Sequence, residues 1–102
     1  MQSSIRLAVV CVMQKVFEAL ASAQRRAILT YVSQADMTAG EIASRFDVSR
    51  SATSQHLGIL EEAGLIRGEK RGPFMVYTLL ADNLSRPLLG FVEDCGRDFP
   101  AQ

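Results

Sequence analysis

The sequence predicts a mainly α-helical domain with a single β-hairpin, in the order α-α-α-α-β-β-α. Two observations support this class. Residues 38–64 read as two short helices around a tight turn, and after Gly64 the apolar period changes from about 3.6 residues to 2, which indicates strands. At 102 residues the chain is long enough for one domain with its own core, and small enough for dimerisation to help stabilise it.

Residues 5–21 and 23–32 read as the first two helices. Ser22 is the expected N-cap of the second. In the first, apolar side chains recur at helical spacing along one side, with Phe17 beside them. These side chains are Ile5, Ala8, Val9, Val12, Val16 and Leu20. The stripe is more apolar than a surface helix needs, so it is either covered by the rest of the domain or shared with a second subunit.

The stretch 38–64 contains its own start and stop signals. Thr38 is an N-cap residue with Glu41 three positions later, the spacing of a capping box, and Ser49 is an N-cap residue for the second run. Gly64 ends that run, because a residue without Cβ adopts the left-handed conformation at low cost. These signals predict a helix-turn-helix.

The second helix of this pair has two contrasting faces. Its apolar stripe consists of Thr53, Leu57, Leu60 and Ala63. The opposite face carries Arg50, Ser51, Ser54, Gln55 and Gly58. Such a face can lie in the DNA major groove, where Arg matches guanine, Gln matches adenine and Ser reaches bases or phosphates. The candidate DNA contacts are Arg50, Ser51, Thr53, Ser54 and Gln55. Ser54 and Gln55 are favoured because they lie one turn into the polar face; the alternative is an amphipathic helix with a solvated face.

Two short strands follow at residues 65–70 and 74–79, separated by an Arg-Gly-Pro turn. A β-hairpin attached directly to a groove-reading helix is a wing, which we place at 65–80. Its tip carries Lys70 and Arg71, which are well placed for contacts to phosphate or to the minor groove. The alternative is a solvated turn that happens to be basic.

Residues 84–98 read as the last helix. Its apolar residues are Leu84, Leu88, Leu89, Phe91, Val92 and Cys95. Proline is tolerated in a helix only near the first turn, so Pro87 makes Ser85 a better N-cap than Asp82. In order, these elements make a winged helix-turn-helix, in a single domain over residues 1–102.

Charge is segregated along the chain although the formal net charge is zero. Basic residues flank the reading helix at Arg45, Arg50, Arg67, Lys70 and Arg71, and acidic residues lie near the end at Glu93, Asp94 and Asp98. Arg25 and Arg26, at the start of the second helix, either contact phosphate or are simply solvated. Zero net charge leaves a second reading open, in which the winged helix is a protein-interaction module.

Several other classes of protein are not expected. No apolar run approaches the roughly 20 residues of a membrane span, and residues 5–13 have a charge inside them and no cleavage pattern behind them. No Ser/His/acid set, Cys-x-x-Cys or Gly-rich phosphate loop suggests an enzyme. Cys11 and Cys95 are too widely spaced for a metal knuckle or a disulfide framework, so the expected location is a reducing cytoplasm.

Four blocks of sequence resemble, in order, the bacterial ArsR/SmtB family of winged-helix repressors. The blocks are Phe17 to Leu29, Glu41-Ile42-Ala43, Ser49 to Leu57 and Leu60 to Ile66, and the resemblance covers roughly residues 13–95. It implies a homodimer joined through the first and last helices, at 5–21 and 84–98. It also implies a palindromic double-stranded DNA operator and repression that an inducer relieves. Two reading helices would then enter successive major grooves about 34 Å apart.

The family's metal-sensing sites do not carry over to this chain. Metal-binding members place cysteines at the head of the helix-turn-helix, where this chain has Thr38, Gly40 and Ala43. Others place His and Asp ligands on the last helix, but the only histidine is His56, in the family's Ser-x-His-Leu pattern, where a structural role is expected. No metal and no cofactor are therefore expected.

The two thiols are what remains for sensing. Some arsenite-responsive members carry adjacent cysteines at the tail, but Gly96 replaces the second one here, and three soft ligands cannot come from one chain. The hypothesis is that Cys11 and Cys95 approach each other within or across the dimer and sense an oxidant, a persulfide or an arsenical. The alternative is two small apolar residues buried in a dimer interface. A thiol-regulated repressor and a metalloid-responsive repressor both stay open, with the inducer unknown.

Overall fold

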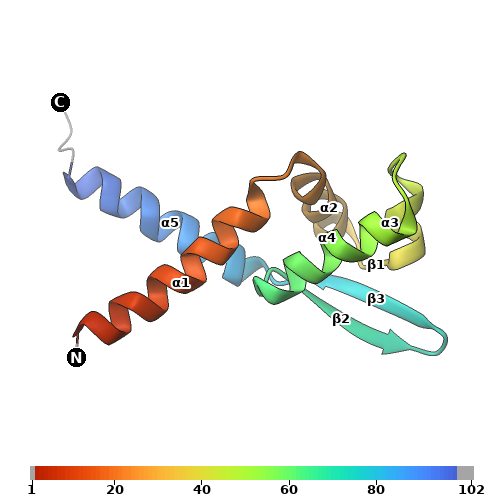
Figure 1. The fold of residues 1–102 in the computed structure, drawn as a ribbon, viewed down its shortest axis with the longest axis horizontal. Coiled ribbons are helices and arrows are strands. Elements are labelled where there is room, and N and C mark those ends of the chain that lie inside the picture. Colours follow the sequence, from red (N-terminus) through yellow and green to blue (C-terminus); the bar gives the residue numbers. More distant parts are fainter. Residues whose placement is uncertain (1, 99–102) are drawn as a thin grey trace.

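The computed structural model describes residues 2–98, and within them the side chains of residues 11–96. In chain order the elements are α1 (Gln2–Leu20), α2 (Ala23–Gln34), β1 (Met37–Thr38), α3 (Ala39–Ser44), α4 (Arg50–Glu62), β2 (Ile66–Arg71), β3 (Phe74–Leu79) and α5 (Ala81–Asp98). The predicted order of helices and hairpin is confirmed, with one additional short strand. Figure 1 shows α2 to β3 as one body, from which α1 and α5 extend on the side away from the wing.

The predicted caps begin three of the helices. The Ser22 hydroxyl accepts a hydrogen bond from the backbone N–H of Arg25 (3.3 Å), and the Ser49 hydroxyl accepts one from Ala52 at the start of α4 (3.1 Å). At the start of α3 the capping box is complete. The Glu41 N–H donates to the Thr38 hydroxyl (3.1 Å), and the Thr38 N–H donates to the Glu41 carboxylate (2.9 Å).

The sheet has three antiparallel strands in the order β1-β3-β2. Strand β1, in which Met37 pairs with Tyr77 and Thr38 with Val76, was not predicted. Two residues are too short to display a period of their own, and the strand exists because β3 offers it a partner. In the hairpin, Gly72 at the turn has a positive φ of 61°, and Gly64 at the end of α4 has a φ of 76°, as its stop role predicts.

One apolar core joins the helix-turn-helix to the sheet. The buried hydrophobic residues are Val16, Ala19, Ile28, Leu29, Val32, Ile42, Leu57, Leu60, Leu65, Ile66 and Tyr77. They come from α1 through β3, and among the described side chains α5 contributes only Leu84, which is partly buried against this core. The chain from α1 through β3 therefore forms the packed domain, and α5 lies outside it.

The start of α5 differs from the prediction. The helix begins at Ala81, and the Ser85 hydroxyl donates to the Asp82 carbonyl (3.5 Å) instead of capping the helix. The reason is tertiary anchoring: the Leu80 N–H donates to the Leu65 carbonyl (2.9 Å), and the Asn83 side-chain amide donates to the Gly64 carbonyl (2.8 Å). These bonds hold the chain in place before Pro87, which therefore lies inside the helix.

The two outer helices cross each other (Figure 1). Where they meet, the rings of Phe17 in α1 and Phe91 in α5 pack edge to face, with centroids 5.5 Å apart. Even so, several large apolar side chains on these helices are exposed, Phe91 among them. Val12, Leu89, Phe91 and Val92 are 56%, 59%, 48% and 62% exposed. The molecule is correspondingly elongated, with extents of 49 × 34 × 21 Å.

Candidate nucleic-acid interface

Helix α4 presents one polar, exposed face and buries the other. Leu57 and Leu60 are buried in the core. The residues predicted on the opposite face are all exposed: Arg50, Ser51, Ser54, Gln55 and Gly58. None of these side chains is bulky and apolar, so the face is narrow enough to approach a groove.

Thr53 does not belong to this surface. Its side chain is 2% exposed, and its hydroxyl donates to the Ser49 carbonyl one turn earlier (3.1 Å). The prediction that Thr53 contacts DNA is therefore wrong. The physical reason was visible in its spacing, because Thr53 shares the helical stripe of Leu57 and Leu60.

Arg25 has a structural role that the sequence analysis did not predict. Its Nε donates to the Ala19 carbonyl (2.8 Å) and its Nη2 to the Glu18 carbonyl (3.0 Å), both in the last turn of α1. The carbonyls of a last turn have no partner within their own helix, so these bonds cap α1 from outside. Arg25 thus has a structural role, and its phosphate contact stays a prediction.

Arg26 caps the same helix end. Its Nη1 donates to the Leu20 carbonyl (2.6 Å), while the side chain as a whole stays exposed. Together, Arg25 and Arg26 attach the start of α2 to the end of α1. Of these two predicted phosphate contacts, Arg26 is the more exposed.

The wing places its two predicted basic residues on opposite faces. In the hairpin register Lys70 pairs with Met75 and Arg71 with Phe74, and successive residues of a strand point to opposite sides. Arg71 forms an ion pair with Glu69 (3.8 Å), whereas no ion pair links Lys70 to any residue within the described part of the chain. Lys70 therefore offers the full positive charge at the wing tip, and that of Arg71 is partly neutralised.

Two exposed apolar residues on the wing were missed by the sequence analysis. Phe74 is 60% exposed and Met75 39% exposed, although both lie in a strand. The sequence feature that indicates exposure is the position of Phe74 directly after the Gly-Pro turn, at the hairpin tip, which the core does not include. The wing tip thus combines positive charge with apolar surface.

His56 ties α4 to the start of α2. Its Nδ1 lies 3.3 Å from Arg25 Nη1, and its Nε2 lies 2.8 Å from Gln24 Oε1. Burial, and after it the neighbouring charge of Arg25, lower the pKa of His56 below its usual value. The expected structural role of this histidine agrees with these contacts.

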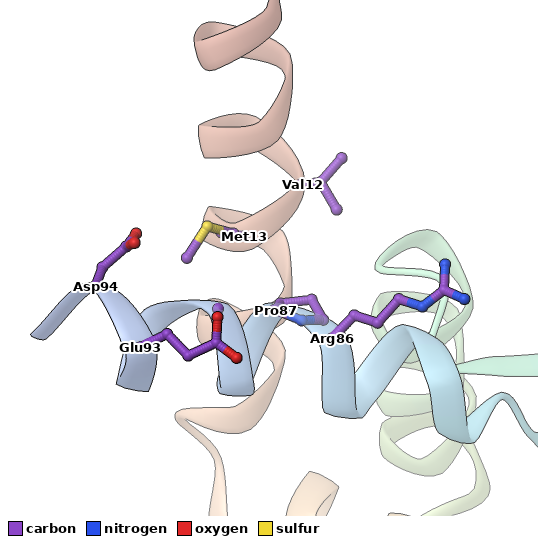
Figure 2. A pocket seen from close by; sticks show the side chains of 7 residues that line it. Val12, Met13, Arg86, Pro87, Glu93 and Asp94 are labelled. Atoms are coloured by element: carbon purple, nitrogen blue, oxygen red, sulfur yellow. The ribbon is translucent and has the colours of Figure 1, made fainter. Parts of the chain in front are cut away.

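A cavity of about 450 Å³ lies where α1 and α5 cross. It is lined by Val12, Met13, Arg86, Pro87, Gly90, Glu93 and Asp94. Figure 2 shows Met13 on α1 close to the crossing point, with Pro87 opposite it on α5. The surface is largely apolar and open, which suits another protein surface better than a small charged ligand.

The thiols lie on these same two helices. Cys11 is exposed and Cys95 is half-buried, and both are free. Within the part of the chain that the structure describes, no three His, Cys, Asp or Glu side chains are grouped so that they could hold a metal ion. No helix among the residues described is long and apolar enough to cross a membrane.

The fold and the exposed polar face of α4 define a winged helix-turn-helix protein of the nucleic-acid-binding type. Residues 20–69 match a family described as a helix-turn-helix domain. Over 67 residues the chain is 42% identical to the transcriptional repressor SdpR of Bacillus subtilis, and the match covers 66% of this chain and 74% of that protein.

Two further comparisons agree. The chain is 37% identical over 62 residues to the transcriptional activator HlyU of Vibrio cholerae, covering 61% of this chain and 57% of HlyU. An ArsR-like transcriptional regulator from Rhodococcus sp. RHA1 superimposes with a TM-score of 0.79 at 32% identity, covering 90% of this chain and 86% of that one. The chain belongs to the ArsR/SmtB family of winged helix-turn-helix transcriptional regulators, and it is a DNA-binding regulator rather than an enzyme.

Proposed function

We propose that this protein is a homodimeric repressor that binds a palindromic operator through α4 and the wing. One observation carries the proposal. The face of α4 that carries Arg50, Ser51, Ser54 and Gln55 is exposed along its length, while the opposite face is fixed in the core. A helix held rigidly on one side and polar on the other is suited to reading base edges.

The exposed apolar side chains of α1 and α5 support the dimer. Val12, Leu89 and Val92 are more than half exposed, and the core described above does not use them. Apolar surface of this kind is favourable to bury, at roughly 25 cal/mol per Å². A second copy of the chain, related by a two-fold axis, covers these residues and aims two α4 helices at one side of the pair.

The charge distribution supports recognition by local contacts. The formal net charge is zero, so long-range attraction to DNA is weak. Positive charge is concentrated at Arg50 on α4 and at Lys70 on the wing. The dimer therefore depends on a good fit to its operator more than a strongly basic protein does.

Repression follows if the operator overlaps a promoter, because the bound dimer then blocks the polymerase. SdpR is named a repressor and HlyU an activator, so relatives act in both directions. The similarity to SdpR, at 42% identity over 67 residues, favours repression for this chain.

The thiols are the proposed route to induction. Cys11 is exposed on α1 and Cys95 is half-buried on α5, so modification of either alters the surface that the second copy would cover. An oxidant, a persulfide or an arsenical would then change the angle between the two halves and release the operator.

Selection from a random pool of duplexes, followed by footprinting and sedimentation of the complex, tests the proposed function. The expected result is protection of two inverted half-sites by one dimer. Failure to retain any duplex at low salt would instead favour a protein-interaction module.

A further inference from the structure

The contacts of His56 specify its protonation state. An arginine side chain only donates hydrogen bonds, so Nδ1 of His56 must accept from Arg25 Nη1 at 3.3 Å. The carbonyl oxygen of Gln24 only accepts, so Nε2 must donate to it at 2.8 Å. Both partners together require a neutral imidazole with its proton on Nε2.

The same contacts form a continuous path from the reading helix to α1. His56 lies on α4, Arg25 on α2, and the remaining bonds of Arg25 go to the carbonyls of Glu18 and Ala19. Since α1 is a dimerisation helix under the proposed function, this path joins the DNA-reading element to the element that sets the spacing of the two halves.

The hydrogen-bond partners described for His56 offer no negative charge to a protonated ring. Arg25 of α2 is the charged group in hydrogen-bond contact with His56. Lys15 and Glu18 of α1 and Glu62 of α4 line a pocket together with Arg25. Glu62 pairs with Lys15 (3.8 Å), and the Glu18 carboxylate accepts from the Gln14 amide (3.0 Å). None of the hydrogen bonds described for His56 involves a carboxylate.

We propose that His56 is a pH-sensitive positioning residue, which fixes α4 against the α1–α2 junction when neutral and releases it when protonated. Operator binding then weakens on acidification. This inference rests on the proposed function, because it concerns how the reading helices are held for DNA. Protonation places an N–H on Nδ1 directly against the Arg25 guanidinium, so the hydrogen bond is lost and two positive charges face each other.

The direction of the pH effect follows from linkage. The pKa of His56 is lowered in the folded protein, so the unfolded chain binds the proton more readily. Stability is therefore complete above the usual value of about 6.5 and is lost as the pH falls from there toward the folded-state pKa. Ordinary carboxylates titrate near pH 4. Between pH 7 and 5.5, protonation of the histidine therefore dominates the pH dependence of stability.

The first test uses the fact that His56 is the only histidine. Long-range 1H–15N NMR of the imidazole, on the full chain without DNA, reports its tautomer and its pKa without ambiguity. We expect the Nε2–H tautomer and titration below the usual value. The Nδ1–H tautomer, or titration at about 6.5, would overturn the proposal.

The second test compares parent and His56→Asn on the duplex selected at pH 7. Asparagine keeps an acceptor close to the position of Nδ1 and cannot be protonated. Below the His56 pKa, parent affinity should fall with pH, up to roughly tenfold per pH unit for each of the two His56 residues of the dimer. The affinity of His56→Asn should stay flat with pH, whatever its value at pH 7. Gln34→Ala, which removes an exposed side chain from α2 and no contact of His56, should keep the parent's pH profile.

The two failures can be told apart. If parent and His56→Asn bind the operator with the same pH dependence, the role of His56 is excluded and the proposed function stands. If no duplex binds at pH 7, the proposed function fails, and the inference about operator binding fails with it, whereas the NMR result still reports the tautomer.

Discussion

The carboxylate of Glu61, one residue before the end of α4, accepts a hydrogen bond from the backbone N–H of Gly68 in β2 (3.4 Å). The reading helix and the root of the wing are thus in direct contact. Burial, and after it the negative charge of Glu61, raise the pKa of Tyr77 on the neighbouring strand. A Cβ at position 68 would lie 2.9 Å from the Tyr77 ring and 3.2 Å from the Glu61 carboxylate, so this close approach requires glycine.

Gly68→Ala should therefore lower the free energy of unfolding by about 1–3 kcal/mol, because the added methyl group has no room. Urea denaturation measures this. Gly58→Ala is the matched control. Nothing lies within 4 Å of its new Cβ, and glycine is a poor helix former, so stability should rise by about 0.5–1 kcal/mol. Equal stability of Gly68→Ala and parent would mean that the wing moves aside freely.

Gln55→Ala should weaken binding to the selected operator by about 1–3 kcal/mol and relax specificity at one base pair. Fluorescence anisotropy with operator and scrambled duplexes measures both. Gln34→Ala removes an exposed glutamine from α2 and should leave affinity unchanged. Equal losses on the two duplexes would exclude Gln55 from reading bases.

Lys70→Ala should weaken binding to all sequences and reduce the slope of log K against log salt by about 1 for each copy in the dimer, because each copy loses one phosphate contact. Arg71→Ala should have a smaller effect, since Glu69 already offsets its charge. Glu69→Gln should in turn tighten binding to random DNA. A salt slope that Lys70→Ala leaves unchanged would mean that the wing tip does not reach the backbone.

Val92→Glu should produce a folded monomer. The side chain is 62% exposed in the single chain, so its replacement leaves the core intact, but a charge there opposes association. Sedimentation should show the monomer. The affinity for the full operator should fall, while the affinity for a single half-site should be retained. Gln34→Glu adds the same charge on α2 and should stay dimeric. A dimeric Val92→Glu would place the interface elsewhere.

The double variant Cys11→Ser, Cys95→Ser should stay on the operator when hydrogen peroxide or an arsenical releases the parent, because it has no thiol left to modify. Mobility shift assays on both proteins measure the released fraction. Each single variant then identifies the thiol that is needed. If the double variant is released from the operator as readily as the parent, thiol sensing is excluded as the route to induction.

The elements that the sequence predicted well are those set by local chemistry. Ser22, Thr38 and Ser49 cap helices because a side-chain oxygen satisfies a free N–H two or three residues later, and this needs no knowledge of the rest of the fold. The end of α4 at Gly64 is likewise a local feature, because glycine readily adopts the positive φ needed there. The exposed face of α4 followed from helical spacing alone.

The errors arose where contacts with distant segments of the chain determine the local structure. The strand β1 exists only through its pairing with β3, and α5 begins early because Asn83 is bonded to Gly64. The role of Arg25 depends on helix ends six residues earlier and on His56, 31 residues later. Thr53 was a different error, since its place on the apolar stripe could have excluded it.

The separation of the core from the outer apolar helices also bears on how the regulator responds to its own abundance. Since α1 through β3 share one buried core and α5 adds only the partly buried Leu84 to it, we expect one chain to fold before it meets another. Under the proposed function, occupancy of a two-part operator rises with the square of the chain concentration when dimers are scarce. A modest change in expression would thus give a steep, switch-like change at the promoter.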